Sequence, residues 1–418
     1  MKHQFDVVVV GAGPGGLAAA AVAAEAGRSV CLVDDNPAPG GQIWRGQAGK
    51  PGPAREWLRR ASEANATVWS GLRVVDAPGE NLLRLEGPAG VRQVAFSKLI
   101  LATGARERFL PFPGWTLPGV IGAGAAQAFL KSGYQVKGKR AIVAGSGPLL
   151  LAVAAALRVN GARVQGIYEQ APLGRLIRFG ASLFRHPGKI TEGVRYRLQT
   201  GLAPYRTSSR VVRAEGSGRV ERVTVATGAR EWTVDCDLLA CGFHLVPNVE
   251  LPQLLGCRLE EGFVRVDAEQ RSSRNDVFCV GELTGVGGLN KALLEGEAAG
   301  YAAAGRPERA SKLEPALARQ RRFAREMTTA FALQPELRSL PKAETHVCRC
   351  EDVPLKAMQS RADWRDAKLH TRAGMGACQG RVCGSAAEFL FGWEKHDARP
   401  PVFPATVAAM AQDTQDND

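Results

Sequence analysis

The order of apolar and polar positions along the first 305 residues predicts short strands that alternate with helices. Val7–Val10 is a continuous run of β-branched residues, which is typical of a parallel strand buried on both faces. A glycine turn and an alanine-rich run follow it, and Ser29–Val33 is the next apolar run. The same succession of strand, turn, helix and strand returns at residues 139–170. This alternation predicts an α/β fold built on parallel sheets.

The turn after the first strand has the spacing of a dinucleotide-binding turn. Gly11 permits a tight turn, Gly13 lets the backbone approach a pyrophosphate, and Gly16 lets the helix pack closely on the strand. The helix that follows offers free N–H groups and the positive end of its dipole to the phosphates. Asp34 ends the second strand, where a carboxylate can bind a ribose and would repel a 2′-phosphate. The turn therefore predicts a dinucleotide other than NADP.

Three further segments extend this pattern in a fixed order. APGGQIWRG follows the second strand, KLILATGARER is an apolar strand with a glycine exit, and DVFCVGELTG is another such strand. The residues placed beside a bound cofactor are Gly40, Gly41, Gln42, Ala102, Thr103, Gly104, Gly281 and Glu282. Together with the first turn, these segments resemble the two-dinucleotide-domain flavoprotein disulfide reductase superfamily over roughly residues 5–305.

The resemblance implies FAD at the first turn. In that superfamily the acid after the second strand holds the ribose of the ADP half, the Ala-Thr-Gly strand closes the site, and a Gly-Asp pair contacts the ribitol. Asp34, Ala102–Gly104 and Gly281–Glu282 occupy those positions. Glu282 replaces the aspartate and keeps a carboxylate acceptor. The implied fold is an FAD-binding Rossmann-like domain with an inserted NAD(P)-binding-like Rossmann domain.

The second glycine turn, in GSGPLLL, departs from the NAD(P)H site of that superfamily. Gly145 and Gly147 hold the first two glycine positions, but Leu150 occupies the third and is expected to push helix and strand apart. The next strand ends at Glu169, with no arginine pair for a 2′-phosphate. We predict that NADPH does not bind here. Two alternatives stay open: an adenine nucleotide (NADH or a mononucleotide) held by Gly145, Gly147 and Glu169, or an empty site.

A redox-active cysteine pair is missing from the expected places. No C-x2-C or C-x4-C pair comes directly after Gly41, and none lies in residues 120–235. Cys236 and Cys241 flank a predicted strand and are five positions apart, so their side chains are expected on opposite faces. We predict buried, reduced thiols there. The electrons of the flavin then need a different exit.

Four cysteines near the C-terminus are the candidate exit. They are spaced as C-x-C, a gap of 27 residues and C-x4-C, and they are Cys348, Cys350, Cys378 and Cys383. Zinc knuckles space their cysteines by two to four residues, whereas iron–sulfur clusters take four thiolates and are tuned by N–H groups and nearby charge. Glycines and basic residues lie close by, at Gly374, Gly376, Gly380, Gly384, Arg349, Lys368, Arg372 and Arg381. We favour a [2Fe–2S] cluster over zinc, and over a disulfide, which a reducing cytosol disfavours.

This C-terminal segment resembles the bacterioferritin-associated-ferredoxin type of [2Fe–2S] domain, although its closing C-x4-C is longer than that ferredoxin's closing pair. The whole chain resembles the α subunits of heteromeric bacterial amino-acid dehydrogenases: opine oxidases, hydroxyproline and proline dehydrogenases, and hydrogen cyanide synthase. GSGPLLL and GMGACQGRVC carry that match. The resemblance implies a catalytic β subunit similar to D-amino-acid oxidase, and it leaves open an FMN between subunits and a small γ subunit. This chain would then relay electrons.

No catalytic residue is predicted in the chain. Its six histidines are scattered, and no Ser/His/Asp pattern, spaced carboxylate pair or pocket for an amino acid is evident. We therefore expect an electron-transfer subunit of an amino-acid dehydrogenase. D-hydroxyproline or a related D-amino acid is favoured as the substrate of the complex over an opine or glycine. The alternative is a self-sufficient NAD(P)H-dependent reductase that passes electrons through FAD to the cluster.

Size and composition bound the domain plan and the location. The 418 residues predict an FAD-binding domain at 1–115 and 246–305, an NAD(P)-binding-like domain at 116–245, a helical linker at 306–345, the [2Fe–2S] domain at 346–396 and a tail at 397–418. The chain is 45% hydrophobic, but no apolar run is long enough to span a bilayer. Its first apolar run enters the glycine turn, which favours a strand over a signal peptide. We expect a cytoplasmic protein.

The net charge of +13 is spread along the chain. One basic cluster, Arg319–Arg325, lies on a predicted helix with apolar residues between the arginines. A solvated helix face is the simpler interpretation. The other is a docking surface for an acidic partner, or a peripheral contact with anionic lipid at the inner face of the membrane. The chain lacks the interleaved aromatic pattern that would indicate nucleic-acid binding.

Overall fold

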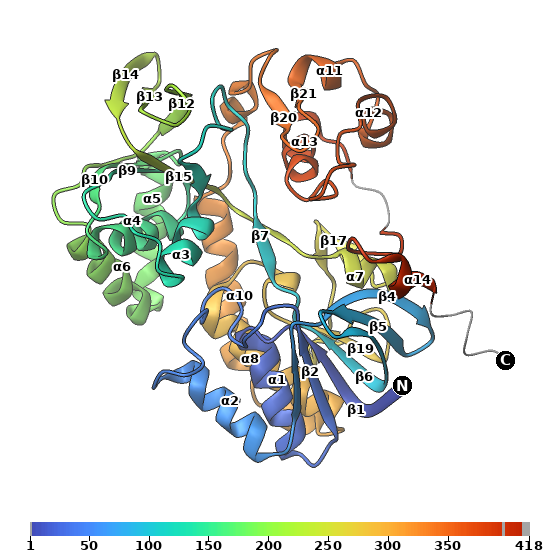
Figure 1. The fold of residues 1–418 in the computed structure, drawn as a ribbon. Coiled ribbons are helices and arrows are strands. Elements are labelled where there is room, and N and C mark those ends of the chain that lie inside the picture. The colour runs from blue at the N-terminus through green and yellow to red at the C-terminus, as the bar shows by residue number, and fades with distance from the viewer. Residues whose placement is uncertain (1, 395–397, 412–418) are drawn as a thin grey trace. The chain divides into compact units, whose positions relative to one another are not determined.

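The computed structural model describes residues 2–394 and 398–411. The chain divides into two compact units, each with its own sheet of parallel or mainly parallel strands (Figure 1). The first unit takes residues 1–106, 247–324 and 397–418, and the second takes 107–246 and 325–396, as far as these are described. The short strands β7 (Ala105–Glu107) and β16 (Leu245–Pro247) stand where the chain passes from one unit to the other. The predicted α/β fold is confirmed.

The first unit is built on a seven-stranded sheet in the order β3-β2-β1-β6-β5-β4, with β19 beside β6. Its strands are β1 (Lys2–Val10), β2 (Val30–Asp34), β3 (Thr67–Ser70), β4 (Arg73–Gly79), β5 (Leu82–Gly87), β6 (Gly90–Leu101) and β19 (Val277–Cys279). The pairs among β1, β2, β3, β6 and β19 are parallel, whereas β5 pairs antiparallel with β6 and β4. Val7–Val10 are all buried, as expected for a strand covered on both faces.

The second strand begins one residue later than predicted and includes Asp34. Ser29 lies outside the strand because its N–H and its hydroxyl both donate to Asp6, at 2.9 and 2.8 Å. Asp34 therefore stands at the carboxyl end of β2, beside the first glycine turn.

Small residues bring two helices of the first unit close together. α1 (Pro14–Glu25) packs against α8 (Gly288–Ala303), and a Cβ atom on Gly296 or Gly300 would collide with the backbone of α1. The other elements of this unit are α2 (Pro53–Glu63), α7 (Glu250–Leu254), β17 (Leu259–Glu260), β18 (Phe263–Val264), the 3-10 helix η2 (Gly281–Thr284), α9 (Pro307–Ser311) and α14 (Val407–Ala411).

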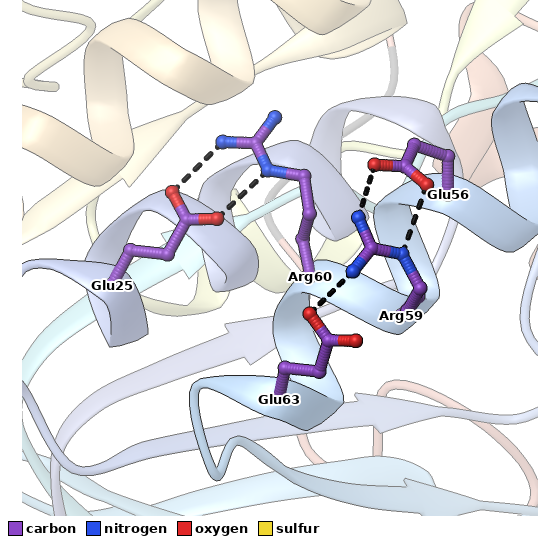
Figure 2. A network of polar contacts seen from close by, with 5 residues as sticks. All are labelled: Glu25, Glu56, Arg59, Arg60 and Glu63. Atoms are coloured by element: carbon purple, nitrogen blue, oxygen red, sulfur yellow. Dashed lines mark hydrogen bonds and ion pairs between the residues drawn. The ribbon is translucent and has the colours of Figure 1, made fainter.

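Ion pairs lie on the surface of α2, and one of them joins α2 to α1 (Figure 2). Arg59 binds Glu56 and Glu63 at 2.6 and 2.5 Å. Arg60 binds Glu25 of α1 at 2.8 Å. These side chains are largely exposed to solvent, so the pairs add little stability.

The predicted basic cluster, Arg319–Arg325, lies on α10 (Glu314–Ala330), as expected for a helix. Arg321 binds Glu314 at 3.1 Å, which offsets part of the positive charge. Arg319, Arg322 and Arg325 are exposed. The cluster therefore has the features of a solvated helix face.

The second unit contains a five-stranded parallel sheet in the order β11-β10-β9-β15-β8. Its strands are β8 (Val120–Gly122), β9 (Arg140–Ser146), β10 (Arg163–Glu169), β11 (Tyr205–Arg206) and β15 (Leu238–Phe243). An antiparallel sheet of β12 (Ser209–Glu215), β13 (Arg222–Thr227) and β14 (Arg230–Asp235) belongs to the same unit. Its helices are α3 (Ala123–Lys131), α4 (Leu149–Val159), α5 (Leu173–Ser182), η1 (Leu183–Arg185) and α6 (Pro187–Gln199).

Leu150 is accommodated at the third position of the second glycine turn. α4 begins two residues after Gly147, whereas α1 begins one residue after Gly13. Leu150 is fully buried in an apolar core with Val153 and Leu157. The expected separation of helix and strand is thus absorbed by a later helix start and by apolar packing.

The last part of the second unit has a small core of its own. Its elements are η3 (Pro335–Ser339), β20 (His346–Cys348), β21 (Val353–Pro354), α11 (Leu355–Gln359), α12 (Trp364–Thr371) and α13 (Cys383–Phe391). Val347, Met358 and Ala367 are buried together. The carboxylate of Asp363 caps α12 by accepting the N–H of Asp366 at 2.8 Å. This core positions the cysteine-bearing loops.

The tail predicted at 397–418 lies partly outside the described residues, at 397 and 412–418. In the described part, the N–H of Val402 donates to the carbonyl of Val75, and the Thr406 hydroxyl donates to Glu86 at 2.6 Å. Among the described helices, none has the length and apolarity that crossing a bilayer requires.

Candidate functional site

The first glycine turn is shaped by close backbone approach. Gly11 has a φ of +105°, and a Cβ atom there would collide with the carbonyl of Ala102. A Cβ atom on Gly16 would collide with the carbonyl of Gly11. Gly13 has no atom within 4 Å of the place where its Cβ would lie. The turn therefore leaves open space at Gly13, where a pyrophosphate is expected to approach the backbone.

The loop after β2 passes beside this turn, as predicted. The N–H of Gly40 donates to the carbonyl of Ala12 at 2.8 Å. A Cβ atom on Gly41 would lie 2.9 Å from the Cα of Gly13. The side chain of Gln42 accepts from Arg45 at 3.1 Å. The structure thus brings Gly41 and the first turn together.

Asp34 is held at the edge of the turn by three N–H groups. Its Oδ2 accepts the N–H of Ala12 at 2.5 Å, and its Oδ1 accepts the N–H and the side-chain amide of Asn36, each at 2.8 Å. The residue is only 6% exposed. These bonds fix the carboxylate in one orientation, and Oδ2, which accepts a single bond, keeps a lone pair for a further donor such as a ribose hydroxyl.

The Ala-Thr-Gly segment is tied to Asn248, a residue that the sequence pattern did not identify. The Thr103 hydroxyl donates to the carbonyl of Asn248 at 2.9 Å, and the Asn248 amide donates to the carbonyl of Thr103 at 2.8 Å. The N–H of Asn248 donates to the carbonyl of Gly104 at 3.0 Å. Arg106 donates to Asn248 at 2.7 Å and binds Glu250 at 3.0 Å. The partner that closes this segment is thus 145 positions along the chain.

The Gly281–Glu282 turn rests on a buried ion pair that the sequence pattern also missed. Gly281 has a φ of +76°. Its carbonyl accepts from the ammonium of Lys291 at 2.9 Å, and its N–H donates to the carboxylate of Glu295 at 2.8 Å. Thr284 contacts both partners at 2.8 Å. The only sequence signal was an i, i+4 Lys–Glu spacing, which is common on exposed helices.

Glu282 is a buried carboxylate with one unused oxygen. Its Oε1 accepts the N–H of Gly288 at 3.1 Å, and its buried Oε2 has no hydrogen-bond partner among the described residues. Burial raises the pKa of this carboxyl group. An unsatisfied buried acceptor calls for a donor from outside the chain. The ribitol hydroxyls of FAD fit that requirement, so the residues present fit the flavin.

The second glycine turn is satisfied from within the chain. The N–H of Gly147 donates to Glu169 at 2.8 Å, and the N–H of Ala171 donates to the other oxygen of that carboxylate, also at 2.8 Å. Glu169 is fully buried, and burial raises its pKa to about 7. In contrast to Gly13, the second glycine here already has its N–H bound.

Residues 331–334 form a covering segment across the carboxyl ends of three strands in this unit. The carbonyl of Phe331 accepts from Ser146 at 2.7 Å, from His244 at 2.6 Å and from Gln170 at 3.3 Å. The N–H of Gln334 donates back to Gln170 at 2.9 Å. Ser146, Gln170 and His244 end or follow β9, β10 and β15. The covering segment thus occupies the edge where a nicotinamide dinucleotide lies in open sheets of this kind.

The four C-terminal cysteines lie together. Cys348 and Cys383 are buried, Cys378 is half-buried and Cys350 is exposed. The Cys383 thiol donates to the sulfurs of Cys348 and Cys378, which lowers the pKa of Cys348 to about 6 and that of Cys378 to about 4. Backbone N–H groups of Gly374 and Gly380 contribute to these shifts. The same contacts raise the pKa of Cys383.

Glycines are required in these loops because other groups press on them. A Cβ atom on Gly374 or Gly380 would lie 2.6 or 2.9 Å from the Trp364 ring. One on Gly376 would collide with the Cβ of Cys350. Arg372 binds Glu351 at 2.8 Å, so part of the predicted positive charge beside the cysteines is already paired.

The described residues include no group of three or more His, Cys, Asp or Glu side chains with the geometry of a single-ion metal site. A structural zinc needs four ligands around one point. A [2Fe–2S] cluster shares four thiolates between two irons, so its sulfurs need not meet at one point.

Two further cysteines, Cys236 and Cys241, lie in the core of the second unit. Both are fully buried. Burial raises the pKa of Cys236 to about 12 and raises that of Cys241 as well. Such thiols have little nucleophilic thiolate at neutral pH. The prediction that they lie on opposite faces is wrong, because Cys236 precedes β15 and both thiols pack in the same core.

Comparison with known proteins places the chain in a family. The model of the pyridine nucleotide-disulphide oxidoreductases matches residues 5–312. The chain therefore belongs to this family, whose members are flavin-dependent oxidoreductases, and membership implies FAD binding.

Within that family the chain groups with subunits of larger enzymes. It is 34% identical to hydrogen cyanide synthase subunit HcnB of Pseudomonas aeruginosa, with 90% of both chains covered. It is 29% identical to an opine oxidase subunit of Rhizobium meliloti, over 99% of this chain and 88% of the relative. The crystal structure of L-proline dehydrogenase from P. horikoshii shares the fold, with a TM-score of 0.67 at 19% identity over 98% of this chain and 80% of that one. The two sequence relatives confirm the predicted subunit family.

Proposed function

We propose that this chain is the FAD- and [2Fe–2S]-containing electron-transfer subunit of a heteromeric amino-acid dehydrogenase. Two features of one chain carry the proposal. The first dinucleotide turn fits FAD, and four cysteines near the C-terminus lie close to one another. Cys236 and Cys241 are fully buried free thiols in the core of the second unit, and they offer no exposed disulfide as an alternative acceptor.

FAD at the first turn is held by residues of the first unit only. Gly11, Gly13 and Gly16 shape the turn, Asp34 accepts from the ribose, and Glu282 accepts from the ribitol. Gly41, Gln42 and Ala102–Gly104 line the same site. Bound FAD supplies the chemistry of taking up an electron pair and releasing single electrons. The chain's own part is to bind and orient it.

Cys348, Cys350, Cys378 and Cys383 would ligate the cluster. Their mutual contacts and their backbone N–H donors support this assignment. A cluster accepts one electron at a time, which suits a relay between a flavin and a one-electron acceptor.

The substrate pocket belongs to a partner in this proposal. The names of HcnB and of the opine oxidase relative each describe one subunit of an enzyme. We propose a catalytic β subunit similar to D-amino-acid oxidase, with a small γ subunit in addition. D-hydroxyproline or a related D-amino acid is the favoured substrate of the complex, before opines and glycine. The complex is expected in the cytoplasm.

An FMN between subunits, if this complex holds one, has a fitting place in the second unit. A groove of about 710 Å³ is lined by Trp115, Arg210, Arg213, Lys342 and His346. Its cationic side chains outnumber its two carboxylates, Glu231 and Glu344, and suit a phosphate, and its indole suits a flat ring. Replacing Arg210 and Arg213 by alanine should lower the FMN content of the purified complex. An FMN content equal to the wild type would rule this groove out.

The alternative, a self-sufficient NAD(P)H-dependent reductase, is disfavoured by the covering segment. Residues 331–334 satisfy the polar groups of Ser146, Gln170 and His244 at the edge that a nicotinamide would need. An adenine mononucleotide at Gly145, Gly147 and Glu169 stays a prediction. The domain bounds given by the sequence likewise stay a proposal.

Metal and flavin analysis of the anaerobically purified chain tests the proposal. We expect FAD, iron and acid-labile sulfide, with about two irons per chain. One zinc per chain with no iron would overturn the cluster, and a chain that carries neither flavin nor iron would overturn the relay as a whole.

A further inference from the structure

We infer that α5, η1 and α6 form a peripheral membrane surface that binds anionic lipid. These three consecutive helical elements span residues 173–199 and contain no buried residue apart from His186 between η1 and α6. η1 contacts both helices, which lie on the second unit (Figure 1). Large exposed apolar patches mark sites that contact a protein or a membrane.

The apolar side chains form a stripe on each helix. On α5 and η1 the stripe consists of Leu173, Ile177 and Phe184, which recur at helical spacing. The inner side of α5 is different, because Leu176 and Phe179 pack against Phe331. The side chains of the outer stripe therefore do not face the core of the second unit.

The stripe on α6 continues past the end of the helix. Val194, Leu198 and Leu202 follow at intervals of four residues. Together with the α5 stripe they are between 53% and 97% exposed. Each would gain about 1.5–3 kcal/mol from full burial in apolar surroundings.

The charge of residues 173–202 indicates which kind of partner this surface binds. Residues 173–202 carry six Lys or Arg side chains and a single acid, Glu192, so the segment is strongly positive. Arg178 and Arg195 are exposed and form no ion pair with any carboxylate in the described part of the chain. The cores of protein–protein interfaces are depleted in charged residues as a class, whereas this segment carries a strong net positive charge. Exposed apolar stripes flanked by Arg and Lys are the pattern of helices that lie in a membrane interface.

No described helix can span a bilayer, so the contact would be peripheral. An anionic leaflet attracts each nearby Lys or Arg by about 1 kcal/mol. The side chains of Phe184 and Leu198 would enter the boundary between headgroups and acyl chains. Attachment would then depend on both the arginines and the apolar stripe.

Flotation of the full chain with vesicles tests the inference. We expect the wild type to bind vesicles of phosphatidylcholine with phosphatidylglycerol, to bind phosphatidylcholine alone far more weakly, and to be released by salt. Arg178→Glu or Arg195→Glu should each weaken binding about fivefold or more. Phe184→Ser or Leu198→Ser should weaken it about tenfold or more.

Matched variants elsewhere on the second unit serve as controls. Leu369 is 64% exposed on α12, and Arg230 is exposed at the start of β14. Leu369→Ser and Arg230→Glu should leave vesicle binding unchanged, and the circular dichroism spectrum reports folding for all variants. Absence of binding by the wild type, or equal loss in the Leu369 and Arg230 variants, overturns the inference. The inference is also overturned if the wild type binds no vesicles and the α5–α6 variants lose a protein that co-purifies with the wild type. That result would assign the surface to the protein partner.

Discussion

The ammonium of Lys291 lies 2.9 Å from the carboxylate of Glu295, and the two side chains are 3% and 1% exposed. The same carboxylate oxygen accepts the N–H of Gly281 and the hydroxyl of Thr284. The ion pair thus sits beneath the turn that presents Glu282. It fixes the turn through bonds within the chain.

Lys291→Met should destabilise the protein strongly. The change leaves Glu295 buried without its cation, which costs about 3–5 kcal/mol. Chemical denaturation of the apoprotein measures the loss. The double variant Lys291→Met, Glu295→Gln is the control, because it removes both charges and should recover much of the stability. A single variant as stable as the wild type would contradict a structural role for the pair.

Asp34→Ala should weaken FAD binding. Losing a hydrogen bond to a charged group costs about 1.5–3 kcal/mol, or about 10- to 150-fold in affinity. Dilution of the holoprotein, followed by flavin fluorescence, gives the dissociation constant. Asp35→Ala is the matched control, because Asp35 is half-exposed and binds only Asn36 and Arg73 among the described residues. Full FAD retention in the Asp34 variant would show that this carboxylate does not bind the ribose.

Cys378→Ser should abolish the visible iron–sulfur absorption band and leave FAD in place. A serine oxygen is a poor substitute for one of the four thiolates that hold the cluster. Absorption spectra with iron and sulfide analysis provide the measurement. Cys236→Ala should keep the band, because Cys236 is buried in the core of the second unit. A band that survives in Cys378→Ser would show that the cysteine is no ligand.

Acid should loosen the covering segment through His244. Burial lowers the pKa of this imidazole, and the positive charge of Arg108 lowers it further, whereas its bond to the Phe331 carbonyl opposes them. The unfolded chain takes up a proton near pH 6.5 and the folded chain does so only at lower pH. Stability is therefore complete above about pH 6.5 and is lost as the pH falls through the unfolded value.

His244→Asn removes this titration. Asparagine tolerates the left-handed backbone of this position, where φ is +69°. The free energy of unfolding should fall less steeply in the variant than in the wild type between about pH 7.5 and about pH 5.5. Parallel curves would show that His244 does not contribute to the pH dependence.

Local rules explain which parts of the site could be predicted from the sequence. Gly11 and Gly16 were predictable because steric contact within one strand–turn–helix unit demands glycine there. The partners that complete the site, Asn248 and the covering segment, were not. Asn248 lies 145 residues from Thr103, and Phe331 of the covering segment lies 185 residues from Ser146. Local periodicity in the sequence does not predict contacts over such separations. The start of β2 was misplaced for a similar reason, because Asp6 draws Ser29 out of the strand.

The apolar stripes on α5 and α6 show a second limit. The periodicity of leucine and isoleucine predicts a helix but does not say whether its apolar face meets the core. Leu176 and Leu198 differ in surroundings, since the first packs against the Phe331 cluster and the second is 75% exposed. Only the tertiary structure separates the two.

Anaerobic stopped-flow on the isolated, FAD-loaded chain tests the central claim most directly. The flavin absorbance is followed after mixing with D-hydroxyproline, octopine, glycine or NADH, first without and then with the partner subunit. The relay account predicts no rapid bleaching by any of these alone, and bleaching by the amino acid once the partner subunit is present. Rapid bleaching by an amino acid alone would place the substrate site in this chain, and rapid bleaching by NADH alone would establish the reductase instead.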